Sequence, residues 1–119
     1  MQKILVDLNR HLVQLNLNIS QFFIRTYDKQ LRRLVEKAIT RITKLFFDVY
    51  DAIEHWKVGK VSELALEFLE EVDYLLDLIA SKLPLKKVER YTHITRELVQ
   101  VVRTYIVFLD QQRQEHFAF

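Results

Sequence analysis

The sequence has 119 residues, of which half are hydrophobic, and it contains one glycine, one proline and no cysteine. This length excludes a second sizeable core, the missing cysteines exclude a disulfide framework and a thiolate metal site, and no apolar run approaches the length of a membrane span. The formal net charge of +2 excludes a strongly acidic or basic protein, and so few helix breakers favour a single all-α domain with long helices.

The first predicted helix covers residues 2–23. Its apolar residues recur at steps of three and four, the spacing of one helix face, at Leu5, Leu8, Leu12, Leu15, Ile19 and Phe22. Asp7 and Arg10 interrupt this stretch and no small-residue cleavage site is present, so we expect no signal peptide and a cytoplasmic location. The apolar spacing changes phase near residues 24–28. This predicts a break there, with one long bent helix as the alternative.

The second predicted helix, residues 28–57, has the most regular pattern. Its apolar positions are Leu31, Val35, Ala38, Ile42, Leu45, Val49, Ala52 and Trp56. At 100° per residue, most of its positively charged side chains fall on the opposite side, so we predict an apolar inner face and a basic outer face. Gly59 follows this helix, at a place where a left-handed residue commonly ends one.

Two further helices complete the predicted fold. Ser62 is a candidate N-cap for the third, residues 62–82, which Pro84 prevents from continuing. The fourth covers residues 88–113, and its expected inward residues are Val88, Tyr91, Leu98, Val102, Tyr105 and Leu109. Four such helices joined by short turns predict an up-down-up-down antiparallel four-helix bundle that occupies residues 1–119 as one domain.

The second and fourth helices have more apolar surface than the core of this bundle can cover. Exposed apolar surface usually marks a protein partner, and self-association is the simplest way to cover it. The expected contacts of a homo-oligomer are Phe47, Tyr50, Ile94, Val99, Val101, Ile106 and Phe108. A bundle with a few apolar surface residues is the alternative.

Charge is unevenly distributed along the chain. Residues 25–57 carry eight bases against five acids, whereas residues 58–85 carry two bases against six acids. Evenly spaced cations on a helix can contact the phosphates of RNA or DNA, and the alternative is a solvated outer face. The candidates on the second helix are Arg25, Lys29, Arg32, Arg33, Lys37, Arg41 and Lys44. A shorter set belongs to the fourth helix: Lys86, Lys87, Arg90, Arg96 and Arg103.

Patterns typical of catalysis or metal binding are missing from the sequence. It lacks the inward Glu-x-x-His pairs of a di-iron bundle, and we interpret Asp51, His55 and His93 as surface residues. Its serines have no histidine and acid in register, so we interpret them as helix caps or turn residues. These are Ser20, Ser62 and Ser81. The two Arg-x-x-His sequences lack the spacing of helical-bundle ribonucleases. We therefore predict no enzymatic activity, cofactor, metal or small-molecule substrate.

Three segments in the second half of the chain carry a family resemblance. They are Leu-Glu-Glu-Val-Asp-Tyr-Leu-Leu at residues 69–76, Leu-Pro-Leu at 83–85 and Arg-Tyr-Thr-His at 90–93. Together they resemble the four-helix bundles encoded in intervening sequences of 23S ribosomal RNA genes, and most of all the Avd-type accessory proteins of diversity-generating retroelements. The resemblance implies a non-catalytic homopentamer that binds a reverse transcriptase and nucleic acid. The third helix departs from that family because it is acidic, and Asp73 and Asp77 are candidates to pair with bases on a neighbouring subunit.

Two functions are therefore open. The first is a non-enzymatic accessory protein that binds a reverse transcriptase and its template RNA through the basic outer face of an oligomeric bundle. The alternative is a protein-only helical scaffold or adaptor, in which basic and acidic helices are complementary patches that set the subunit register.

Overall fold

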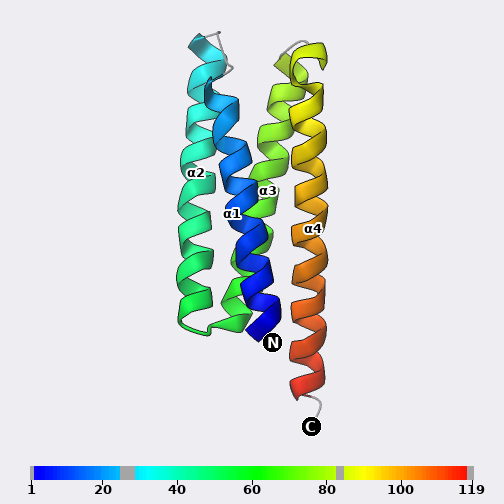
Figure 1. Ribbon diagram of the computed structural model, residues 1–119. Helices are drawn as coiled ribbons and strands as arrows, with labels where there is room; N and C mark the ends of the chain where they lie inside the picture. Colours follow the sequence, from blue (N-terminus) through cyan, green and yellow to red (C-terminus); the bar gives the residue numbers. More distant parts are fainter. Residues whose placement is uncertain (1, 25–28, 83–84, 118–119) are drawn as a thin grey trace.

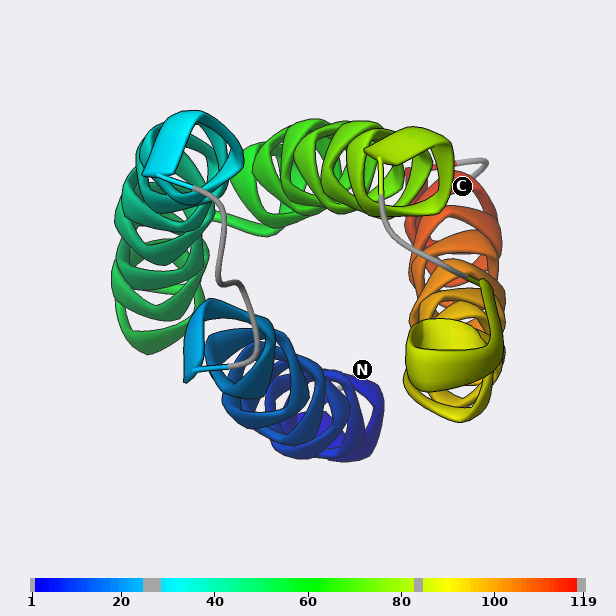
Figure 2. The same cartoon turned by 90° about the horizontal axis from the view of Figure 1, so that it is seen from above.

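The computed structural model describes residues 2–24, 29–82 and 85–117, without the side chains of residues 21–24, 85–88, 91 and 115–117. Its helices are α1 (Gln2–Ile24), α2 (Lys29–Glu54), α3 (Val58–Lys82) and α4 (Leu85–Phe117). They alternate in direction along a rod of 54 × 22 × 18 Å (Figure 1). Seen from one end, each helix packs against two neighbours in the order α1, α2, α3, α4 (Figure 2). The predicted antiparallel four-helix bundle is confirmed, and α1 and α2 are separate helices.

The core contains most of the apolar positions that the spacing predicted for the first two helices, whereas Leu45 is only half-buried. From α1 and α2 it receives Leu5, Leu8, Leu12, Leu15, Ile19, Leu31, Val35, Ala38, Ile42, Val49 and Ala52. The largest fully buried side chain belongs to Phe68 on α3. Predicted inward residues Phe22, Val88 and Tyr91 lie outside the described side chains. None of the described helices combines the length and apolarity that a bilayer span requires.

The predicted inner face of α4 is confirmed at Val102 and Leu109, but at Leu98 and Tyr105 the buried position is the next residue along the helix. Its buried residues are Thr95, Val99, Val102, Ile106 and Leu109, whereas Leu98 and Tyr105 are only half-buried. Both sets have the same spacing of three and four, and the apolar arc of α4 is wide enough to contain both. The observed rotation brings two arginines on one flank of α4 to acids on α3. Val99 and Ile106, predicted as contacts with another subunit, therefore lie in the core of their own chain.

The turn between α2 and α3 differs from the prediction in both of its helix ends. Trp56, expected on the inner face of α2, follows the helix with φ 54° and is exposed. The N–H groups of Lys57 and Trp56 donate to the carbonyls of Ala52 and Ile53 at 2.9 and 3.2 Å. These two bonds form a Schellman motif in which tryptophan occupies the usual glycine position. The predicted cap Gly59 is instead inside α3.

Ser62, predicted as the N-cap of the third helix, is also inside α3 and is buried. The helix begins one turn earlier, because the Val61 N–H donates to the Lys57 carbonyl at 3.0 Å. That bond gives Lys57 the backbone role of the N-cap without a capping side chain.

The left-handed backbone at Trp56 predicts an unusual order of stabilities. Trp56→Gly is expected to be more stable than Trp56→Ala by about 1 kcal/mol, because only the alanine Cβ opposes a positive φ. Both variants lose the indole, so the comparison isolates the backbone. At Gln100, exposed in the middle of α4, the order should reverse, with glycine the less stable. Urea unfolding measures all four variants, and equal stabilities at position 56 would contradict the assignment.

Candidate nucleic-acid interface

The basic stripe of α2 lies on the outer side of the bundle. We use this name for Lys29, Arg32, Arg33, Lys37, Arg41 and Lys44, all of which are exposed. The helix seam that contains Leu31, Val35 and Ile42 faces the core, and this orients the stripe toward solvent. At 1.5 Å per residue the stripe is about 22 Å long. Arg25, predicted as part of it, lies outside the described residues.

Most of the stripe is not neutralised by neighbouring acids. Arg41 Nε lies 4.0 Å from Glu71 Oε2 on α3, so this arginine is shared with a helix contact. Within the described part of the chain, Lys29, Arg33, Lys37 and Lys44 have no acidic oxygen within 4.0 Å. Cations that are exposed and unpaired can contact phosphate without first breaking an ion pair.

The long side chains of the stripe surround a shallow hollow on the surface of α2. Thr40, the shortest side chain there, lies between the longer neighbours that form the rim. The hollow is lined by Gln30, Arg33, Leu34, Glu36, Lys37, Thr40 and Arg41. Because every lining residue belongs to one helix, this hollow is part of an outer surface and is not a cleft between helices.

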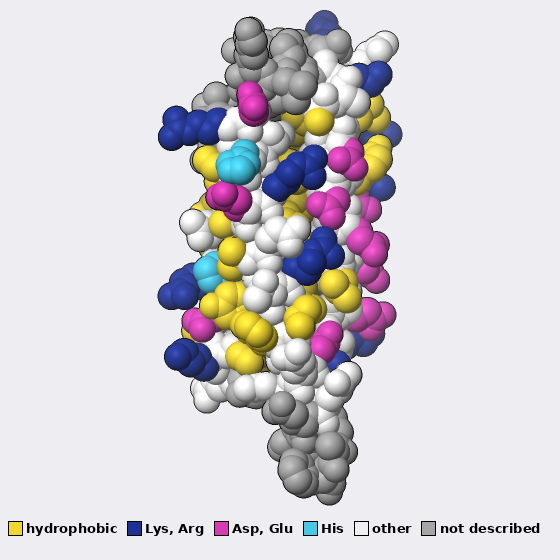
Figure 3. Space-filling view, turned by 90° about the vertical axis from the view of Figure 1, so that its right-hand side faces the viewer, with side chains coloured by type: hydrophobic (Ala, Val, Ile, Leu, Met, Phe, Trp, Pro, Cys, Tyr) yellow, Lys and Arg dark blue, Asp and Glu magenta, His cyan; other side chains and the backbone are white. Residues whose placement is uncertain are grey.

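Two arginines of the basic set predicted on α4 are paired with acids of α3. Arg96 Nη2 lies 3.4 Å from Asp77 Oδ1, and Arg103 Nη2 lies 3.4 Å from Asp73 Oδ2. Figure 3 shows basic side chains next to acidic ones along this α3–α4 face. Both acids, considered as partners for another subunit, are therefore paired within their own chain. Lys86 and Lys87 lie outside the described side chains, and Arg90 is exposed.

The exposed apolar residues form patches on α2 and α4. Of the predicted oligomer contacts, five are exposed: Phe47, Tyr50, Ile94, Val101 and Phe108. Figure 3 shows apolar side chains grouped on the α4 side of the rod. Sequence reasoning missed a further apolar stripe on α1. It consists of Val6, Val13 and Leu17, whose spacing of seven and four residues was the available signal.

The acidic end of α2 has its own hydrogen-bonded groups. A hydrogen bond to the Glu54 carboxylate, together with the charge of that carboxylate, raises the pKa of Tyr50 above its usual value. His55 Nδ1 lies 3.3 Å from Asp51 Oδ1, and both side chains are mostly exposed. Tyr50 therefore lies beside a carboxylate, past the C-terminal end of the basic stripe.

The contact between α1 and α4 contains polar groups that the apolar spacing could not predict. Asn18 Nδ2 donates to Oγ1 of the fully buried Thr95. Half-buried His11 stacks on Tyr105 with 5.0 Å between ring centroids. These contacts hold α1 against α4 and are not part of the basic stripe.

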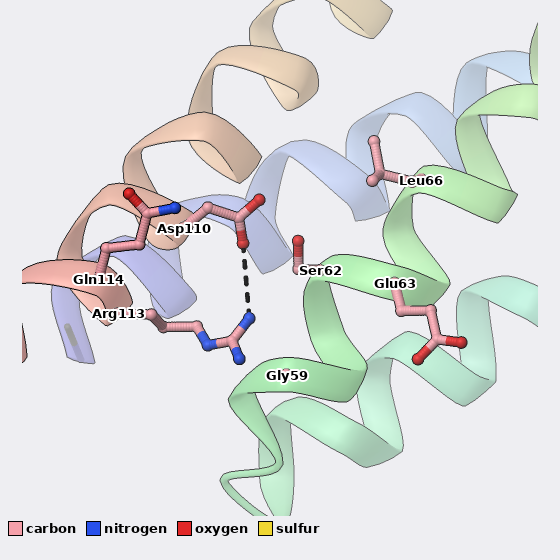
Figure 4. Close-up of a pocket in the computed structure, with 7 residues that line it drawn as sticks. All are labelled: Gly59, Ser62, Glu63, Leu66, Asp110, Arg113 and Gln114. Atoms are coloured by element: carbon pink, nitrogen blue, oxygen red, sulfur yellow. Dashed lines mark ion pairs between the residues drawn. The ribbon is translucent and has the colours of Figure 1, made fainter. Parts of the chain in front are cut away.

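A second hollow lies between the start of α3 and the end of α4 (Figure 4). Arg113 Nη1 lies 3.7 Å from Asp110 Oδ1, and Arg113 Nη2 lies 3.2 Å from where a Cβ on Gly59 would be. Because Gly59 has no side chain, the guanidinium of Arg113 can approach this closely. Glu63 also lines the hollow, so its lining contains one base and two acids. This excess of negative charge does not favour the binding of RNA or DNA.

The residues considered for metal binding or catalysis are dispersed over the surface and helix ends. The described residues contain no group of three or more histidines and acids that could hold a metal ion. His93 Nε2 lies 3.0 Å from Glu97 Oε1 on an exposed face of α4. Ser20 and Ser81 donate to backbone carbonyls three residues earlier, at 2.7 and 2.9 Å.

The chain matches no protein-family model, no curated protein and no solved structure. The resemblance to the intervening-sequence family therefore stays a hypothesis that depends on the three segments of the second half of the chain.

Proposed function

We propose that this protein is a non-enzymatic accessory protein of a diversity-generating retroelement, acting in the cytoplasm. In this proposal it binds the reverse transcriptase and its template RNA, and the basic stripe of α2 is the RNA surface. The single observation that carries the RNA surface is a set of four exposed cations on one side of α2 that have no acidic partner within 4.0 Å among the described residues. They are Lys29, Arg33, Lys37 and Lys44. The reverse transcriptase partner comes from the family resemblance.

Self-association is the second part of the proposal. The apolar patches that it covers are those of Phe47 and Tyr50 on α2 and of Ile94, Val101 and Phe108 on α4. A bundle only 22 × 18 Å across has little surface on which to leave so many large apolar side chains in water. The resemblance implies five subunits, and light scattering measures the number directly.

A protein-only scaffold is the second candidate function. What favours it is the exposed pair Phe47 and Tyr50 next to the basic stripe, because exposed aromatic residues are typical of protein contacts. If charged patches set its subunit register, high salt should dissociate the oligomer. Under the first proposal the apolar contacts should keep it assembled.

The affinity for single-stranded RNA is expected to fall with salt. Four phosphate contacts predict a log–log slope of about −3, because each contact releases counterions. Fluorescence anisotropy with a labelled RNA, repeated at several salt concentrations, measures this slope. A slope near zero, or no binding at about 50 mM salt, would contradict RNA binding by the stripe. The oligomer part of the proposal is tested separately by light scattering without RNA.

A further inference from the structure

The outer face of α2 changes its charge halfway along the helix. Residues 29–44 contain the basic stripe with Glu36 as their one acid, whereas residues 48–54 contain Asp48, Asp51 and Glu54 and no base. Phe47, with 60% of its surface exposed, lies at the boundary, and half-exposed Tyr50 follows one turn later. The face therefore has a basic half, an aromatic centre and an acidic half.

This order makes the face complementary to itself. If two copies of α2 lie antiparallel, the basic half of each meets the acidic half of the other. The two-fold axis then passes near Thr43. Lys44 and Asp48, which carry opposite charges, lie one helical turn apart beside that axis.

The hollow on α2 is at the right distance to receive the aromatic residue of a second copy. Phe47 and Thr40 are seven residues apart, so they lie on the same side of the helix about 10 Å from each other. With the axis near Thr43, Phe47 of one copy lies opposite the hollow around Thr40 of the other. The stems of Lys37 and Arg33 and the side chain of Leu34 supply the apolar walls.

The same alignment brings opposite charges of the two copies together. Asp51 of one copy lies within one turn of Arg33 in the other, and Glu54 lies within one turn of both Arg33 and Lys29. Neither Arg33 nor Lys29 has an acidic partner within 4.0 Å among the described residues of its own chain. The contact therefore forms new ion pairs without breaking existing ones between helices.

We propose that α2 docks antiparallel on α2 of a second copy of this chain. Phe47 of each copy anchors the contact, and ion pairs between Arg33 of one copy and Asp51 of the other lie on either side. Aromatic residues at the centre of an interface usually supply most of its affinity, and charges at the rim supply its register. This inference rests on the self-association part of the proposed function and not on RNA binding. Because a two-fold contact joins subunits in pairs, it predicts an even number of copies in place of the five that the resemblance implies. RNA and the second copy compete for Arg33 and Lys37.

A charge exchange at one pair tests the geometry. Arg33→Glu alone places acid against acid twice in each dimer, and Asp51→Arg alone places base against base twice. Each single variant is expected to weaken self-association through α2 at least tenfold. In an equimolar mixture of the two, both pairs become attractive. Sedimentation velocity of nuclease-treated protein at low salt should then show a heterodimer of wild-type affinity. Because the heterodimer forms only if both variants present a folded α2 surface, recovery of association also shows that both variants are folded.

The mixture has two possible outcomes. Recovery supports the antiparallel contact, and an unchanged weak association in the mixture overturns it. Tyr74→Ser on α3 is the matched control, because it removes an exposed aromatic side chain that belongs neither to the proposed contact nor to the apolar patches of α2 and α4. If Phe108→Ser abolishes association while Phe47→Ser leaves it intact, α4 is the interface and the proposal is wrong.

A cross-link gives an independent readout. The chain has no cysteine, so Thr43→Cys introduces a single thiol beside the proposed axis and should form a disulfide-linked dimer on mild oxidation. Gln100→Cys on the outer side of α4 should not. Equal cross-linking of both variants contradicts the inference. Asp51→Arg also separates the two proposals, since it should weaken the α2 contact while RNA affinity is kept or increased.

Discussion

The variant with Lys29, Arg33, Lys37 and Lys44 all changed to glutamate is expected to lose RNA affinity by about three orders of magnitude at ~0.1 M salt. Each lost phosphate contact removes the release of about one counterion, which is worth somewhat less than tenfold at this salt concentration. The four residues are exposed and have no acidic partner among the residues that the structure describes, so their substitution breaks no described ion pair between helices. Arg41 is left unchanged because it pairs with Glu71. Fluorescence anisotropy measures the affinity, and circular dichroism should show unchanged helical content.

The matched control carries the same change in net charge elsewhere on the rod. Lys3, Lys57, Lys60 and Lys82 are exposed lysines outside the basic stripe, and their substitution by glutamate should reduce affinity by less than tenfold. This control separates local contact from the general attraction between a cation and a polyanion, which acts over a distance of about 10 Å at this salt concentration. Equal losses in the two variants would remove the stripe from the proposal and leave only a general charge effect.

The fold could be predicted wherever only one helix face was apolar. In α2 the most regular apolar positions are centred on one face and the bases lie opposite, so the spacing alone placed Val35 and Ile42 inside and Lys37 outside. In α4 the apolar arc covers two overlapping faces of the same period. The choice between Leu98 and Val99 then depends on packing against α3 and α1, which no periodicity within one helix contains.

The turn between α2 and α3 shows a second limit of prediction from the sequence. Gly59 was a reasonable cap because glycine has no Cβ to oppose a positive φ, yet the chain places Trp56 in that conformation. The Schellman bonds join backbone groups only, so their formation does not require a particular side chain. The length of the turn is decided by where both helices can bury their apolar faces.

The candidate site was partly predictable for the same reasons. Exposure of the basic stripe follows from the inner face of α2, and the structure places its described members outside as predicted. The neutralisation of Arg96 and Arg103 by Asp77 and Asp73 did not follow, because it depends on the relative rotation of two helices. Pairing between helices is a property of the assembled bundle and not of either helix alone.

Phe68→Ala is expected to destabilise the bundle by about 3–5 kcal/mol, or roughly 10–20 °C in Tm. Phe68 has 0% of its surface exposed and is the largest fully buried side chain of the core. Removing its ring costs the transfer free energy of the lost atoms and leaves a cavity, because the long helices on each side cannot collapse onto the space without disturbing other core contacts. Phe68→Leu should cost less, since it leaves a smaller cavity.

Phe47→Ala is the matched control for this substitution, because the same ring is removed from a site where 60% of the surface is already exposed. Its effect on the unfolding free energy should stay below about 1 kcal/mol, since most of its ring is in water before and after unfolding. Urea unfolding at a dilution where the chain is monomeric measures both variants, and an unchanged m value shows that the comparison concerns the native state. Equal losses of unfolding free energy at positions 68 and 47 would mean that Phe68 is not buried in the core of the bundle.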